Sequence, residues 1–436
     1  MSVRHWSSKF LSLLIAVLCG SQMAFSQIPT PAEKQTKSIL FLGATAHIGN
    51  GEVIKRSAIG VQDGKIIEVK AAIDIQLDTT KYDTIYHLDG KHIYPGFIAP
   101  NSRLGLVEID AVRASRDFAD VGQFNPHVRS ITAYNTESRI TPTVRSNGVL
   151  IAQIAPKGGV LSGSSSIVSL DAWNWEDALI KADDGIHLNW PNPYSKSTKK
   201  KEADNNYLKE LEELSRFFEE ARAYYKTDFI LEKNLRFEAM KKLFDGNANL
   251  FVHANDVKSI TDAIYFSDQF NIKMVLVGGH DAWLVADLLK DREIPVLLRK
   301  VHSLPKYEDE DIDLPYRLAT LLSQKGVLVG LENSGSMEAM GTRNLPFYAG
   351  TTVTYGMSKA EALSLITLNT AKILGIDDML GSLMEGKQAT LFISEGDALD
   401  INSNNVTYAF IQGRKINLSN PQKELYIKYS KKYEEN

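Results

Sequence analysis

Several basic or imidazole side chains stand at or just beyond the ends of short apolar runs. They are Arg103, His253, His280, Arg299, Lys300, His302 and Arg343. Arginine can hold a carboxylate or phosphate through two parallel hydrogen bonds, and neutral imidazole can bind a metal or accept a proton. In one pocket these side chains would bind a small acidic ligand, with Arg103, Arg299 and Arg343 as the candidate contacts. The alternative, with equal weight, is a set of unrelated charges on surface loops.

The apolar runs alternate with amphipathic stretches over the middle of the chain. We predict strands and, between them, helices; the strands span 97–101, 149–155, 250–254, 274–277, 295–298 and 327–331, and the helices 260–270, 282–290, 317–324 and 359–374. Apolar strands joined by helices are typical of a parallel sheet covered by helices. Residues 96–380 are therefore predicted to form a (β/α)8 TIM-like barrel. The C-terminal strand ends of such a barrel meet at one face, which would bring the basic residues together.

Both ends of the chain contribute a second pattern, of short strands. They occupy 38–95, where Asp63-Gly64 is a hairpin turn signal, and return at 390–394 and 406–412. We predict that 38–95 and 381–418 form one small β-sandwich domain. Three other segments have their own predictions, namely a flexible loop at 158–166, a charged helical hairpin at 196–247 and a charged C-terminal helix at 419–436.

The chain resembles the amidohydrolase superfamily in several motifs. Tyr94-Pro95-Gly96-Phe97-Ile98 and the following Leu104-Gly105-Leu106 resemble its first barrel strand, P-G-[aliphatic]-I-D-x-H-x-H-[Leu]-G. The segments 366–375 and 381–391 are similar to its last helix and returning strand, and 123–129 resembles imidazolonepropionase-like members. This resemblance implies a barrel fold and a metal-dependent hydrolase that acts on C–N bonds.

The resemblance also implies a ligand set for one or two divalent metals. Family members use two histidines on strand one, one each on strands five and six, and an aspartate on strand eight. These positions fall here on Asn101, Arg103, His253, Gly278 and, depending on register, Ser334 or Asn333. An amide is a weak zinc ligand, and a guanidinium stays protonated and cannot ligate. Only His253 keeps the expected residue type.

Two further residues are candidates for acid–base chemistry. His280 follows the Gly278 position by two residues, and Glu332 is the carboxylate nearest the strand-eight position. Each has a simpler alternative, an ordinary polar residue at a strand end. Because most of the metal-ligand positions hold other residue types, we do not predict hydrolysis from these two candidates.

The N-terminus and the composition bear on location and partners. Residues 1–26 have the layout of a secretory signal peptide, with basic residues, an apolar run and a small-residue cleavage site, and 27–37 is predicted to be a linker. Cys19, the only cysteine, lies within that leader. A net charge of -4 and 44% hydrophobic residues give no sign of a nucleic-acid partner or, after cleavage, of membrane association. We expect an exported protein, periplasmic in a bacterium or secreted.

These observations favour an exported amidohydrolase-fold protein that is catalytically degenerate and acts as a binding or scaffold subunit. No cofactor is expected; the candidate partners are a small acidic ligand and an active homologous subunit. The alternative is an active hydrolase of non-peptide C–N bonds, in a cyclic amide or peptide-like substrate. It would use an unconventional or single metal, such as zinc, at His253. Whether the protein is an enzyme is left open.

Overall fold

The computed structural model describes residues 30–72, 78–194, 200–335 and 337–434. The predicted signal peptide and the first residues of the linker lie outside this part of the chain. Within it, no helix is both long and apolar enough to cross a membrane.

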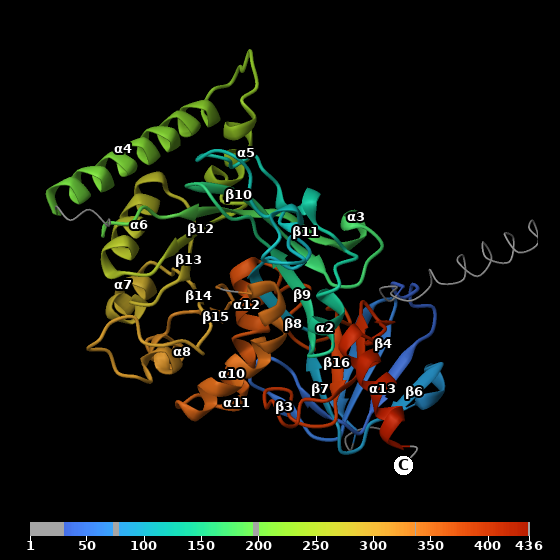
Figure 1. The fold of residues 1–436 in the computed structure, drawn as a ribbon. Coiled ribbons are helices and arrows are strands. Elements are labelled where there is room, and N and C mark those ends of the chain that lie inside the picture. The colour runs from blue at the N-terminus through green and yellow to red at the C-terminus, as the bar shows by residue number, and fades with distance from the viewer. Residues whose placement is uncertain (1–29, 73–77, 195–199, 336, 435–436) are drawn as a thin grey trace, which may run out of the picture.

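An eight-stranded sheet curls into a nearly closed barrel and confirms the predicted fold class (Figure 1). Its strands follow chain order, namely β8 (Phe97–Ser102), β9 (Val149–Ile154), β10 (Leu161–Ser169), β11 (Leu179–Asn189), β12 (Asn249–Ala254), β13 (Met274–Gly278), β14 (Val296–Leu298) and β15 (Val329–Leu331). From β11 to β15 every pair is parallel, as expected.

Strand β10 departs from the regular barrel. It runs antiparallel to both β9 and β11, with no helix before it. The predicted flexible loop at 158–166 is therefore wrong from Leu161 onward. The serines that suggest a loop have hydrogen-bond partners here: the Ser165 hydroxyl donates to Asp184 at 2.8 Å, and the Ser166 hydroxyl accepts the Asp183 N–H at 3.0 Å. Partners far along the chain thus allow a polar segment to form a buried strand.

The gap between the first and last barrel strands is bridged by the backbone of residues 365–366. The Leu331 N–H donates to the Leu365 carbonyl at 3.1 Å, and the Ile98 N–H donates to the Ile366 carbonyl at 2.9 Å. These contacts explain why the single helix predicted at 359–374 is divided into α11 (Lys359–Ser364) and α12 (Leu368–Leu374). The backbone between them forms bonds with the sheet.

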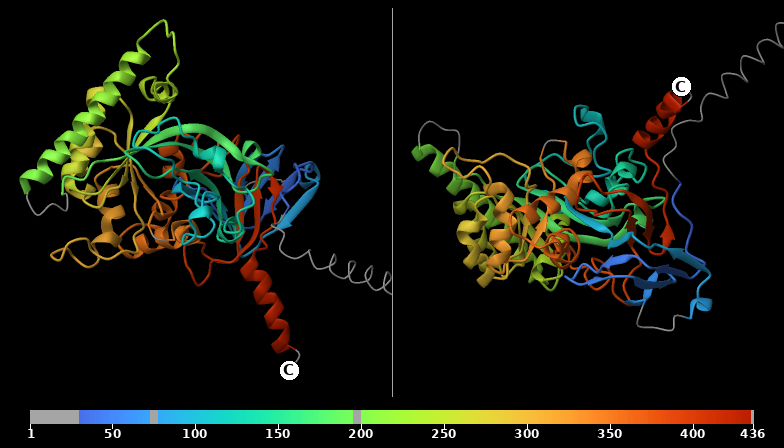
Figure 2. Two further views of the ribbon diagram at one scale, coloured as in Figure 1. Left: turned by 45° about the horizontal axis from the view of Figure 1, so that its top comes forward. Right: turned by 90° about the horizontal axis from the view of Figure 1, so that it is seen from below.

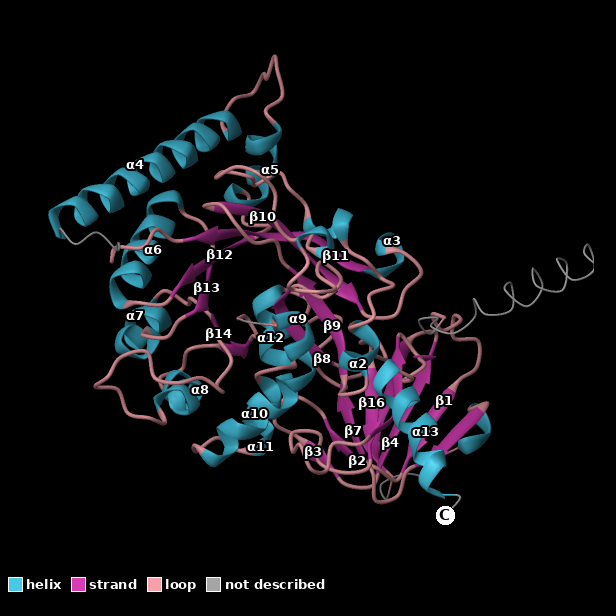
Figure 3. Ribbon diagram, viewed as in Figure 1, coloured by secondary structure: helices cyan, strands magenta, loops and turns pink. Residues whose placement is uncertain are grey.

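Helices cover the second half of the barrel (Figure 3). They are α6 (Val257–Phe270), α7 (Ala286–Asp291) with the 3-10 turn η4 (Ala282–Val285), α8 (Leu314–Gln324), α9 (Glu338–Gly341), η5 (Thr342–Asn344) and α10 (Leu345–Thr354). The charged hairpin predicted at 196–247 corresponds to α4 (Lys200–Tyr225) and α5 (Leu235–Phe244). The first half of the barrel has only the short α2 (Thr141–Arg145) and α3 (Trp175–Ala178).

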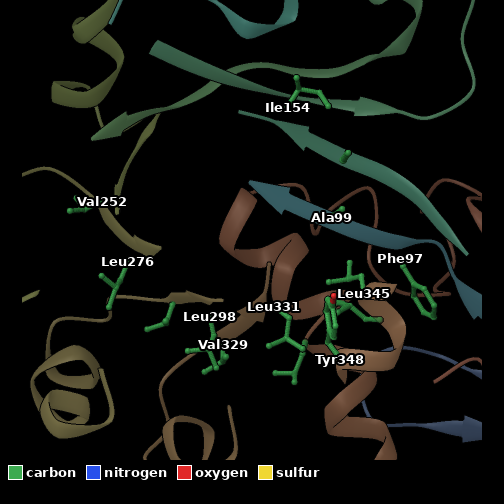
Figure 4. Packing of buried hydrophobic residues seen from close by; sticks show 14 of the residues in the cluster. Phe97, Ala99, Ile154, Val252, Leu276, Leu298, Val329, Leu331, Leu345 and Tyr348 are labelled. Carbon is green, nitrogen blue, oxygen red and sulfur yellow. The ribbon is translucent and has the colours of Figure 1, made fainter. Parts of the chain in front are cut away.

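The side chains of each barrel strand alternate between two apolar clusters, as the pleat requires. One cluster contains Val252, Leu276, Leu298 and Leu331, and continues to Leu345 and Tyr348 of α10 (Figure 4). The other contains Ile98, Ile151, Ile167, Phe251, Val275, Val277 and Leu297, together with α12. The second cluster fills the barrel interior below the candidate site.

Two more sheets form the composite β-sandwich expected from both ends of the chain (Figure 2). In the first sheet the strand order is β5 (Lys65–Ala71), β4 (Ser57–Gln62), β1 (Ile39–Leu42) and β6 (Thr84–His87). In the second sheet the strand order is β18 (Arg414–Lys415), β17 (Val406–Ile411), β16 (Leu391–Ser394), β7 (His92–Pro95), β2 (Thr45–His47) and β3 (Val53–Ile54). The helix α13 (Pro421–Glu434) follows and buries none of its residues.

Asp171 joins the barrel to this β domain. Its carboxylate lies 2.6 Å from Arg145 Nη1 of α2 and 3.3 Å from Arg414 Nη1 of β18, and it accepts the Ala32 N–H at 2.9 Å. The side chains of Asp171 and Arg145 are only 1% and 4% exposed. A buried charge without its partner is costly, so this contact holds the two parts together.

We predict that Asp171→Ala lowers the free energy of unfolding by about 3 kcal/mol, because it leaves the Arg145 charge buried without a partner. Urea denaturation measures the change. Asp311→Ala is the control, since it removes an exposed partner of Arg317 and should cost less than about 1 kcal/mol. Equal effects of the two substitutions would contradict this role of Asp171.

Candidate functional site

Alternation along the barrel strands directs polar side chains into the barrel above its apolar interior. His253 lies two residues beyond Phe251, and Gln153 lies two residues beyond Ile151, so each shares a face of the pleat with an interior residue. Arg299 and Glu332 follow the last residues of β14 and β15. These groups come from different strands and meet at the C-terminal end of the parallel strands.

A cavity of about 180 Å³ opens among these side chains. It is lined by Asn101, Arg103, Ala155, Pro156, Lys157, Asn189, His253, Arg299, Ser334, Gly335 and Glu338. A second cavity, of about 320 Å³, shares Arg299 with the first. The candidate contacts Arg103 and Arg299 therefore do meet at one site.

Asn101 links three barrel strands. Its N–H donates to Gln153 Oε1 at 2.9 Å, and its Nδ2 donates to Glu332 Oε2 at 3.3 Å. Gln153 Nε2 in turn donates to Asp184 Oδ2 at 2.7 Å. The Asn101 backbone has φ of 47°, a left-handed conformation that asparagine tolerates better than most residues. A polar chain thus runs from β11 through β9 and β8 to the end of β15.

Glu332 is the fully buried carboxyl of the site. It accepts hydrogen bonds from the Ser334 N–H at 2.5 Å and from the Ser334 hydroxyl at 2.6 Å. Burial raises the pKa of Glu332 to about 7, against the opposing effect of these bonds, the Asn101 bond and the Arg299 charge. The protonated and ionised forms of Glu332 are thus close in free energy near neutral pH.

Arg103 forms an ion pair with Glu338 at the start of α9. Its guanidinium also stacks on the Phe118 ring, 4.6 Å from the centroid. Burial lowers the pKa of Arg103 to about 10, while Asp110 and Glu332 act in the opposite direction, so the side chain stays protonated at neutral pH. The alternative of an exposed surface charge is wrong for Arg103, whose side chain is 11% exposed.

His253 is paired with another imidazole. Its Nε2 lies 2.9 Å from Nδ1 of His187 on β11. Burial, followed by the charges of Lys157 and Arg103, lowers the pKa of His253 to about 4. His253 is therefore neutral near pH 7, and one ring nitrogen is engaged by His187.

Comparisons with known proteins agree with this fold. Residues 320–416 match the model of the amidohydrolase family. A crystal structure of an amidohydrolase from Thermotoga maritima has a TM-score of 0.76 and 22% identity, covering 87% of this chain and 99% of that chain. The chain therefore has the fold of the amidohydrolases, and its residues 320–416 match the family's model.

Further solved structures are similar at lower scores. A prolidase complexed with N-methylphosphonate-L-proline has a TM-score of 0.53 and 14% identity, covering 87% of this chain and 99% of that chain. Molinate hydrolase has a TM-score of 0.52 and 13% identity, with coverages of 89% and 95%. No curated protein matches the chain. At these identities the structural likeness concerns the fold alone.

The residues at the superfamily's metal positions do not form the ligand set that the resemblance implies. Arg103 is a buried cation, Asn101 donates its amide to Glu332, and His253 is paired with His187. At the strand-six position, Gly278 has φ of 99°, and a Cβ there would lie 2.7 Å from Asn255 Oδ1. A ligating side chain there would strain the backbone and displace the Asn255 side chain.

Among the described residues, one group of three side chains could hold a metal ion. It does not include the superfamily's ligand positions. His280, Asp281 and Glu310 offer ligand atoms within 4.8 Å of one another. His280 Nε2 already lies 2.7 Å from Glu310 Oε1, and Asp281 lies 3.6 Å from Lys306 Nζ. The candidate His280 thus belongs to the wall of the larger cavity, not to the smaller one.

The remaining candidates lie apart from the smaller cavity or at its edge. Ser334 lines the cavity and donates to Glu332, whereas Asn333 donates to the Glu338 carbonyl at 2.7 Å. Arg343 is not among the lining residues, and its carbonyl accepts Asn147 Nδ2. His302 contacts Thr351 of α10 at 2.7 Å.

Sequence reasoning missed Lys157, His187, Asn189 and Glu338. His187 and Asn189 lie on β11. Because the sequence pattern did not predict this strand, it gave no reason to expect either residue at the site. Lys157 lies three residues after the end of β9, and its position after a predicted strand end could have indicated it. Glu338 lies on α9, and only the fold brings it to Arg103.

We predict that the stability of the wild type and of Glu332→Gln depends differently on pH. The pKa of Glu332 is about 7 in the folded protein and 4.5 ordinarily, so protonation stabilises the fold at low pH. This contribution is lost as the pH rises from 4.5 through 7. Between about pH 5 and about pH 8 the wild type should lose roughly 2 to 3 kcal/mol relative to Glu332→Gln.

Urea denaturation at several pH values measures this difference. Glu212→Gln, on an exposed part of α4, is the control and should follow the wild-type profile. Parallel profiles for the wild type and Glu332→Gln would mean that Glu332 does not titrate with a raised pKa.

Proposed function

We propose that this protein is a non-hydrolytic member of the amidohydrolase superfamily that binds a small acidic ligand at its barrel mouth. The observation that carries the proposal is the Arg103–Glu338 ion pair at a position where the superfamily places a metal-binding imidazole. A guanidinium cannot ligate a divalent cation, and the paired Glu338 carboxylate is engaged by Arg103.

The electrostatics of the smaller cavity support this proposal. Arg103, Lys157 and Arg299 line it together with one carboxylate, that of Glu338, so the cations outnumber the carboxylates in the lining. Burial is the main cause that lowers the pKa of Lys157, and repulsion by Arg103 and Arg299 adds to it, against the opposing charges of Glu332 and Asp110. An anion between them would relieve that repulsion, and arginine can bind a carboxylate with two parallel hydrogen bonds.

The hydrogen bonds among Asn101, Gln153 and Glu332 support the proposal that the protein does not catalyse hydrolysis. Metal-assisted hydrolysis needs ligands that hold the ion and leave a position for water. Asn101 and Ser334 instead donate their hydrogen bonds to Glu332. In this proposal they position the barrel mouth and take no part in bond cleavage.

An active hydrolase is the second candidate. The buried Glu332 carboxyl at the end of β15 favours it, together with the buried Nε2 of His187, which has no partner among the described residues. A single metal such as zinc at His253 would have to displace the His187 contact. The substrate would then be a cyclic amide or a peptide-like compound with a non-peptide C–N bond.

Export and a scaffold role beside an active homologous subunit complete the proposal. Both rest on the sequence alone, namely the leader-like residues 1–26 and the degenerated metal positions. The ligand-binding role does not depend on either.

Metal content tests the choice between the two candidates. We expect the full chain, dialysed against zinc and then against buffer, to retain far less than one equivalent. Inductively coupled plasma mass spectrometry measures the bound metal. His253→Ala should leave the value unchanged, because His253 is paired with His187 and faces the positive charges of Lys157 and Arg103.

The same measurement has a clear contrary outcome. One equivalent of zinc in the wild type that is lost in His253→Ala would overturn the proposal and favour the hydrolase. Asp281→Asn is a useful companion variant, since it removes a carboxylate of the His280 group. Zinc that depends on Asp281 and not on His253 would place the metal outside the superfamily position.

A further inference from the structure

Two cationic side chains converge beside Gly335. A Cβ built on Gly335 would lie 3.0 Å from Arg299 Nη2 and 3.4 Å from Lys300 Nζ, so both nitrogens face the same small space. Among the described residues neither has a carboxylate partner within 4.0 Å; the Arg299 Nε donates only to the Ser334 carbonyl, at 3.4 Å. Because both nitrogens lie within 3.4 Å of that Cβ position, the two like charges repel each other, and an anion beside them would offset the repulsion.

The same two residues border the larger cavity. Its lining combines cationic and apolar side chains, and its volume is about 320 Å³. The apolar part consists of Leu298, Leu304, Pro315 and Leu318. A ligand that reached from the cationic end into this space would need a charged group at one end and an apolar group at the other.

We propose that Arg299 and Lys300 hold the carboxylate of a small acid whose apolar substituent occupies the larger cavity. This inference deepens the proposed function and depends on it only for the premise that the barrel mouth binds an anion. It assigns the ligand to the class of aliphatic or aromatic monocarboxylates.

Glycine at position 335 lets Arg299 and Lys300 approach the loop backbone, since a Cβ there would crowd Arg299 Nη2. Its φ of 134° is unusual for other residues, and its N–H donates to Glu338 Oε2 at 2.9 Å. The carboxylate that pairs with Arg103 therefore also holds the backbone beside Arg299 and Lys300. No side chain from position 335 fills the space between the two cations.

The apolar wall distinguishes this site from a phosphate site. Phosphate sites commonly use several free backbone N–H groups at a helix N-terminus. Here α8 brings Pro315, which has no N–H, to the cavity. A carboxylate with an apolar substituent satisfies both the cationic and the apolar parts of the lining.

Isothermal titration calorimetry on the full chain tests the ligand class. We expect hexanoate to bind more tightly than acetate, because acetate leaves the apolar wall uncovered. Hexanamide, which has the same chain without the charge, and inorganic phosphate should bind far more weakly than hexanoate. Equal affinity for hexanoate and hexanamide, or tighter binding of phosphate than of hexanoate, would overturn the inference.

Variants locate the site. Lys300→Met should weaken hexanoate binding by about tenfold or more, since it removes a charge-assisted contact, and Lys325→Met should not change it. Lys325 is a matched control that pairs with Asp287 at the surface. Leu304→Asp, at an 84% exposed position of the lining, should weaken hexanoate more than acetate.

The outcomes separate this inference from the proposed function. Unchanged hexanoate affinity in Lys300→Met would overturn the placement at Arg299 and Lys300, whatever the metal content. Stoichiometric zinc at His253 would overturn the proposed function, whereas hexanoate binding that depends on Lys300 would still support the carboxylate site.

Discussion

The positive charge of Arg103 lies where little water reaches, and its neighbours are arranged around that charge. A buried guanidinium must be paired or it destabilises the fold. Glu338 supplies the opposite charge and Phe118 an aromatic face. The same charge helps to keep His253 neutral and lowers the pKa of Lys157. In the proposed function, this arginine stands in place of a metal ligand, and the cations that line the barrel mouth favour an anion.

Glu338 extends the influence of Arg103 to the neighbouring loop. Its second carboxylate oxygen accepts the Gly335 N–H, and Gly335 lies beside Arg299 and Lys300. The charges at the ends of β8 and β14 are therefore connected through a single residue of α9. Beneath them, Asn101 joins Gln153 to Glu332 and ties the first barrel strand to the last, where the sheet itself is not closed by a strand pair.

The apolar strands were predictable because a short hydrophobic run bounded by polar residues is stable mainly as a buried strand. The predicted strands at 97–101, 250–254 and 274–277 correspond closely to β8, β12 and β13. The segment 161–169 was not predictable in this way, since its serines favour a loop locally and become strand residues only through Asp183 and Asp184. With β10 and β11 missed, His187 and Asn189 were missed as well.

The residue types alone indicated the resemblance to the superfamily and predicted weak or absent metal ligation at Asn101, Arg103 and Gly278, because a ligand's chemistry depends on its functional group. Only the tertiary structure decided the partners that replace the ligands. Asn101 and Glu332 are 231 residues apart in the chain, and no local pattern predicts a contact over that separation. Pairing in a barrel depends on strand register and on the loops beyond the strands, which packing of the whole chain sets.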